Sequence, residues 1–87
     1  MEILRSPLRR KLLIYYFTHP DVELYLREIA EIIQVDPGNL SKEMRKLEKD
    51  GIFKSRERGK QKYFSLNKEY FIYKELRSII FKKIGIK

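Results

Sequence analysis

The chain has 87 residues, one histidine, no cysteine and a net charge of +8. This length suits one domain around one small core with little room for an enclosed active site, and the lack of cysteine excludes disulfide frameworks, thiolate zinc sites and thiol redox chemistry. The longest apolar run, Leu12–Phe17, is far shorter than the roughly 18 residues of a membrane span, and no stretch resembles a targeting signal, so we expect a cytoplasmic protein without a membrane segment.

The first predicted helix covers residues 6–18. Ser6 is a suitable N-cap, Pro7 suits the first helical position, and a stripe of apolar residues follows at helical spacing. We expect the helix to stop near His19 and Pro20. The alternating apolar pattern of residues 22–26 then favours a very short strand.

Two short helices are predicted within residues 27–50. Ile29, Ile32 and Ile33 give the first an apolar side. The second has a clear start, because Asp36 can act as N-cap. Pro37 is tolerated at the first helical position, since a backbone N–H there would have no partner inside the helix. We expect it to end at Gly51.

This second helix separates its charges by face. Leu40, Met44 and Leu47 repeat at core spacing, whereas Glu43 and Glu48 point toward the edges of the opposite face. That opposite face presents Gly38, Lys42, Arg45 and Lys49, flanked by Asn39, Ser41 and Lys46. Its like charges repel one another mildly, so we expect an external partner that offsets the repulsion.

A basic hairpin and a last helix complete the pattern. Residues 52–66 read as two strands, with Gly59 in the turn because glycine tolerates positive φ. Residues 69–84 read as a helix. Its apolar stripe, Ile72, Leu76, Ile79, Ile80 and Ile84, is joined by Tyr73 and Phe81, which is more apolar surface than one small core needs.

Positive charge is concentrated in the second half of the chain. Residues 1–40 carry five Lys/Arg and six Asp/Glu, whereas residues 41–87 carry fifteen and six; residues 42–62 alone hold nine basic and four acidic residues. Such a composition is expected of a surface that meets a polyanion. On charge alone, a solvated charged surface is an equally good interpretation.

The stretch YLREIAEIIQVDPGNLSKEMRKLEKDGIFKSRERGKQKYFSLN resembles the ArsR/MarR-type winged helix-turn-helix of prokaryotic transcriptional regulators. The tail EYFIYKELRSIIFKK resembles the helix that often follows the wing in that family. The resemblance implies an α+β winged helix-turn-helix, mainly helical with a small antiparallel β-hairpin wing. Residues 1–87 would form one such domain, with the helix-turn-helix at 27–50, the wing at 52–66 and flanking helices at 6–18 and 69–84.

In that family the second helix enters the major groove of DNA and the wing contacts the backbone or the minor groove. By position, the resemblance places Gly38 beside the groove, with a recognition helix at about 37–50 and a basic wing at 54–62. The DNA-binding residues expected here are Asn39, Ser41, Lys42, Arg45, Lys46, Lys49, Arg56, Arg58, Lys60 and Lys62.

Two positions depart from the family pattern. Gln34 stands where the turn commonly has glycine, so either this residue takes a strained backbone or the turn differs. Gly38 stands where the family often has a polar base-reading residue. Its presence either permits close approach of the backbone to a phosphate or is an ordinary tolerated residue.

No set of catalytic or metal-binding residues is expected. His19 has no cysteine or second histidine to share a metal, unlike the ligand sets of metal-sensing ArsR proteins, and carboxylates such as Glu28 and Glu31 are predicted on an exposed helix face. We therefore expect a non-enzyme without metal or cofactor.

The sequence predicts sequence-specific binding to double-stranded DNA by a transcriptional regulator. The excess apolar surface favours a homodimer through the first and last helices, as the resemblance also implies, with a monomer as the alternative. The rival function is a winged-helix protein-docking module of a transcription or RNA-processing assembly.

Overall fold

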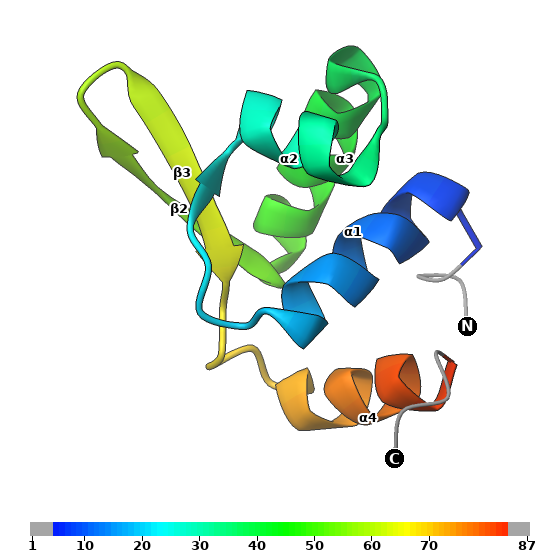
Figure 1. Cartoon of the computed structure of the whole chain (residues 1–87). Coiled ribbons are helices and arrows are strands. Elements are labelled where there is room, and N and C mark those ends of the chain that lie inside the picture. Colours follow the sequence, from blue (N-terminus) through cyan, green and yellow to red (C-terminus); the bar gives the residue numbers. More distant parts are fainter. Residues whose placement is uncertain (1–4, 84–87) are drawn as a thin grey trace.

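The computed structural model describes residues 5–83. These residues form four helices and a small sheet. In Figure 1, α1 (Pro7–Thr18) lies between the helix pair α2–α3 and the last helix. The α+β winged helix-turn-helix architecture predicted from the sequence is confirmed.

Two helices begin at the caps that the sequence predicted. The hydroxyl of Ser6 accepts a hydrogen bond from the backbone N–H of Arg9 at 3.3 Å, at the start of α1. At the start of α3 (Pro37–Asp50), the carboxylate of Asp36 accepts the N–H of Asn39 at 2.9 Å. These bonds satisfy backbone donors that have no partner inside the helix. Gly51 ends α3 in the left-handed region, with φ of 94°.

The turn between the paired helices is strained. It follows α2 (Leu26–Ile33), and its first residue, Gln34, has φ of 57° and ψ of 60°. A residue with a side chain pays a conformational cost there that glycine avoids. Of the two outcomes expected for Gln34, the strained backbone is therefore the one observed.

One residue of the predicted apolar side of α2 does not reach the core. Ile32 is 46% exposed, whereas Ile29, Ala30 and Ile33 are buried. The helix has only eight residues, and these three already cover the side that packs against the rest of the fold.

Three antiparallel strands form the sheet, in the order β1–β3–β2. The wing consists of β2 (Phe53–Arg58) and β3 (Gln61–Leu66), and its two-residue turn uses positive φ at Gly59. The short β1 (Leu24–Tyr25) pairs Leu24 with Phe64 on the other edge of β3. This pairing joins the start of α2 directly to the wing.

The last helix, α4 (Tyr73–Lys83), begins four residues later than predicted. Asn67 explains the difference. Its side-chain oxygen accepts the N–H of Glu69 at 3.1 Å, and its amide group donates to the carbonyl of Gly51 at 2.8 Å. With the backbone hydrogen bond from the N–H of Tyr70 to the carbonyl of Asn67, these bonds place residues 68–72 in turns and a bend. Ile84, predicted as the end of this helix, lies outside the described residues.

Apolar side chains from every helix and from the hairpin form one core, in which α1 is central. Leu12, Leu13, Tyr16 and Phe17 of α1 are at most 1% exposed. Tyr16 meets Phe53 of β2 edge-on at 4.8 Å between ring centroids, and its hydroxyl donates to the backbone carbonyl of Phe64 at 2.9 Å. Burial raises the pKa of Tyr16, so the hydroxyl stays protonated.

Replacing Tyr16 with phenylalanine tests this anchor. Tyr16→Phe removes the buried donor and leaves the carbonyl of Phe64 without it, so we expect the free energy of unfolding to fall by about 1–2 kcal/mol in urea titrations. Tyr15→Phe is the matched control, because Tyr15 is only partly buried on the same helix. Equal stability of the Tyr16 variant and the native protein would show that this hydrogen bond does not stabilise the fold.

Candidate nucleic-acid interface

The outer side of α3 is basic and exposed. Leu40, Met44 and Leu47 are at most 1% exposed on the inner side. Four cationic side chains are exposed on the same helix: Lys42, Arg45, Lys46 and Lys49. Within residues 5–83, none of these four forms an ion pair, and Arg45 only donates to the hydroxyl of Ser41 at 3.4 Å, one turn earlier. Their charges are therefore available to a partner.

The first glutamate of α3, Glu43, holds the helix against α1. The guanidinium of Arg9 contacts its carboxylate at 2.6 Å, and the two side chains are only 23% and 13% exposed. A charge-assisted contact in this partly buried position is stronger than an ordinary surface pair. Glu43 therefore orients α3 and does not add negative charge to its outer side.

The second glutamate, Glu48, holds α3 against the wing. Its carboxylate accepts hydrogen bonds from the hydroxyl of Ser55 on β2 and from the ammonium of Lys62 on β3, the latter at 3.2 Å. The hydrogen bond from Ser55, and then that from Lys62, holds the pKa of Glu48 below its usual value although partial burial acts in the opposite direction. The carboxylate is thus ionised at neutral pH.

Gly38 leaves room for the cap of α3. A Cβ atom added at this position would lie 3.0 Å from the capping carboxylate oxygen of Asp36, which is tighter than ordinary van der Waals contact. Glycine at position 38 therefore keeps the first turn of α3 free of a side chain that would crowd the capping carboxylate.

The wing carries further cations, several of which have partners within the chain. Glu23, in the loop before β1, pairs with Arg56 at 2.8 Å and with Arg58 at 3.7 Å. The guanidinium of Arg58 also lies over the ring of Tyr63 at 5.1 Å. Lys60 is exposed in the turn and forms no ion pair within the described part of the chain. Glu23 therefore reduces the positive charge that the wing presents.

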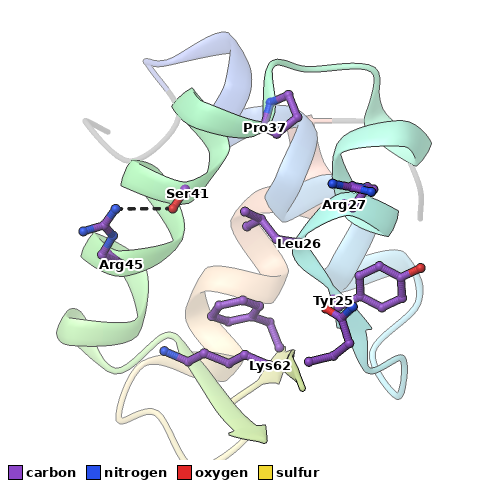
Figure 2. Close-up of a pocket in the computed structure, with 9 residues that line it drawn as sticks. Tyr25, Leu26, Arg27, Pro37, Ser41, Arg45 and Lys62 are labelled. Carbon is purple, nitrogen blue, oxygen red and sulfur yellow. Dashed lines mark hydrogen bonds between the residues drawn. The ribbon is translucent and has the colours of Figure 1, made fainter. Parts of the chain in front are cut away.

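A groove of about 640 Å³ is lined by α3, by the start of α2 and by β3 of the wing. Figure 2 shows Ser41, Arg45 and Lys62 on one side of it, Tyr25 and Arg27 on the other, and Leu26 between them. Pro37, Gln61 and Phe64 complete the lining.

Sequence reasoning did not single out Tyr25, Arg27 and Gln61, which line this groove. Arg27 carries the appropriate charge, but it stands among acidic residues in the first half of the chain. Only the pairing of β1 with β3 places it opposite the basic residues of α3 and the wing. A cation in the first turn of the first helix of the pair was the one signal that could have identified it.

His19 makes local contacts at the end of α1. Its ring stacks on Tyr15 with 4.5 Å between centroids, and its Nδ1 lies 3.0 Å from the carbonyl oxygen of the same residue. Among residues 5–83, no group of three or more His, Cys, Asp and Glu side chains is arranged to hold a metal ion. No described helix combines the length and the apolar character needed to cross a membrane.

Several solved structures share the fold of this chain. No protein-family model and no curated protein matches its sequence. The transcriptional repressor PagR of Bacillus anthracis is 20% identical, with a TM-score of 0.67 over 95% of this chain and 85% of its own. The transcriptional repressor BigR from Xylella fastidiosa is 21% identical, with a TM-score of 0.72 over 97% and 78%. HlyU from Vibrio cholerae is 17% identical, with a TM-score of 0.72 over 97% and 86%.

The contact between α3 and the wing has a testable pH dependence. Because the pKa of Glu48 is lowered in the folded state, its contribution is present above the unfolded value, near 4.5, and is lost as the pH falls through the folded value. We expect Glu48→Gln to reduce the free energy of unfolding by about 0.5–1 kcal/mol at pH 7. This deficit should shrink on acidification below about pH 4.5.

Urea titrations between pH 3 and pH 7 measure this difference. Glu57→Gln is the matched control, because Glu57 is exposed on the same hairpin and forms no ion pair within residues 5–83. A deficit that is the same at every pH would show that the charge of Glu48 does not contribute.

Proposed function

We propose that this protein binds double-stranded DNA at specific sequences and regulates transcription in the cytoplasm, without catalysing a reaction and without a metal or cofactor. The observation that supports it most is the separation of charge on α3. Glu43 and Glu48 are both engaged inside the fold, so the outer side of the helix is left basic from Lys42 to Lys49. The fold, found also in the repressors PagR and BigR, supports the same function.

In this proposal α3 lies in the major groove and the wing contacts the DNA backbone. Arg45 is positioned to reach base edges, since guanine offers two acceptors that a guanidinium can bridge, and Ser41 lies one turn away on the same face. Asn39, Lys42, Lys46 and Lys49 extend the contact along α3. Lys60 and Lys62 contribute phosphate contacts from the wing. Arg56 and Arg58 do the same when a phosphate replaces Glu23 as their partner.

Two substitutions separate base reading from phosphate binding. We expect Arg45→Ala to cost about 1–3 kcal/mol at a specific site and to relax the preference at one base pair, whereas Lys60→Ala should weaken binding to all sequences alike. Fluorescence-anisotropy titrations against a specific and a random duplex measure both effects. Equal losses on the two duplexes for Arg45→Ala would count against base reading.

The rival function is docking of another protein, with the same helix or the wing as the contact surface. Salt dependence distinguishes the two. A DNA-binding protein that neutralises several phosphates should lose orders of magnitude in affinity between about 50 and 200 mM salt. Weak binding to every duplex at 50 mM salt, together with a salt-tolerant protein partner, would favour the docking module.

We also propose that the protein acts as a homodimer through α1 and α4. Leu8, Ile14 and Tyr15 of α1 and Ile79 and Phe81 of α4 are only partly buried within one chain. A two-fold dimer would place two recognition helices on half-sites about 34 Å apart. Sedimentation equilibrium at micromolar concentration should therefore give twice the chain mass of 10.6 kDa, and the chain mass alone would contradict the dimer.

A further inference from the structure

Two arginines of the wing share an acidic partner that comes from outside the hairpin. Arg56 and Arg58 stand two residues apart on β2, so their side chains project from the same face of the sheet. Glu23 lies in the loop between α1 and β1. One of its carboxylate oxygens lies 2.8 Å from the guanidinium of Arg56 and 3.7 Å from that of Arg58. The body of the domain thus neutralises part of the charge of the wing.

The pairing of the strands keeps Glu23 close to the two arginines. Tyr25 on β1 pairs with Tyr63 on β3, and Tyr63 pairs in turn with Arg56 on β2. Glu23 stands two residues before Tyr25 and reaches the same face of the sheet. On this face the ring of Tyr63 also lies 5.1 Å from the guanidinium of Arg58. The carboxylate is therefore held beside the arginines before any DNA arrives.

No other carboxylate among residues 5–83 forms an ion pair with these two arginines. Glu57 stands between them on β2, but successive residues of a strand point to opposite faces, and its carboxylate has no ion-pair partner in the described part of the chain. Asp21, two residues before Glu23, pairs with Lys68 instead. Glu23 is thus the anionic partner that the structure gives to both arginines.

The contact is exposed enough for another anion to replace it. The side chains of Arg56 and Arg58 are about 60% exposed, and that of Glu23 is 32% exposed. Exposed pairs of this kind are weak and are screened by salt. A guanidinium binds phosphate with the same planar donors that it offers to a carboxylate. A DNA phosphate and Glu23 would therefore compete for the same donors.

We propose that Glu23 is an autoinhibitory residue, whose carboxylate occupies the donors of Arg56 and Arg58 in the free protein and is displaced by DNA phosphates on binding. This inference rests on the proposed function, in which the wing contacts the DNA backbone. Because every duplex carries the same phosphates, Glu23 lowers the affinity for all sequences alike. The preference among sequences, which α3 provides, is unchanged.

Replacing Glu23 with glutamine tests the competition. We expect Glu23→Gln to bind both a random duplex and the strongest duplex recovered by selection about threefold to tenfold more tightly, which is the range expected for exposed ion pairs. The ratio of the two affinities should stay the same. The fall of log affinity with log salt should become steeper by about one, because salt no longer assists binding by weakening the pairs with Glu23. Fluorescence-anisotropy titrations from 50 to 200 mM salt measure all three quantities.

Two further comparisons separate competition from a general effect of charge. Asp21→Asn removes the same charge from the same loop but leaves both arginine pairs in place, so it should change the affinity less than twofold. In a protein that already carries Arg56→Gln and Arg58→Gln, adding Glu23→Gln should no longer tighten binding, because the donors that it would release are absent. Circular dichroism of each variant checks that the fold is kept.

The opposing outcomes identify which part fails. If Glu23→Gln binds no more tightly than the native protein, Glu23 does not compete with DNA, and weaker binding would show that it orients the arginines for the phosphates. A gain that persists without the two arginines, or that Asp21→Asn reproduces, would show a general effect of net charge. In each of these cases the proposed function stands. If neither the native protein nor Glu23→Gln binds any duplex at 50 mM salt, the proposed function fails as well.

Discussion

Glu43 and Glu48 connect α3 to its surroundings, the first through Arg9 of α1 and the second through Ser55 and Lys62 of the wing. The candidate interface depends on these contacts in two ways. They set the orientation of α3 relative to the wing, and they use the two carboxylates in the body of the helix for internal bonds. What is left on the outer side of α3 is a row of cations, whose mutual repulsion a polyanion would relieve.

The wing shows the opposite arrangement. Glu23 shares one carboxylate oxygen between Arg56 and Arg58, and both arginine side chains are still about 60% exposed. Exposed pairs of this kind contribute little to stability, at most about 1 kcal/mol. A phosphate can therefore replace Glu23 at small cost, whereas Glu48 is held by two donors and is better suited to a structural role. The interface thus combines an ordered part at Lys62 with an exchangeable part at the tip of the wing.

Local features of the fold could be predicted from the sequence because they depend on neighbouring residues. The first helix begins at Ser6, and α3 begins at Asp36 and ends at Gly51, as expected. Gly59 takes the positive φ of the wing turn. Features that depend on distant residues were missed or misplaced. The start of α4 was misjudged because Asn67 bonds back to Gly51, and Arg27 was overlooked because only the pairing of β1 with β3 brings it to the groove. Among the expected DNA-binding residues, those that also pair within the chain, such as Arg56 with Glu23, could not be predicted, because their partners are distant in the sequence.

The most direct test of sequence-specific DNA binding is selection from a randomised duplex library at two salt concentrations, with sequencing of the DNA that the purified protein retains. We expect an enriched palindromic motif, bound with a steep salt dependence, because a two-fold pair of basic recognition helices should read two equivalent half-sites. Weak, unselective retention that disappears at physiological salt would contradict it and would favour a protein-docking role for the same surface.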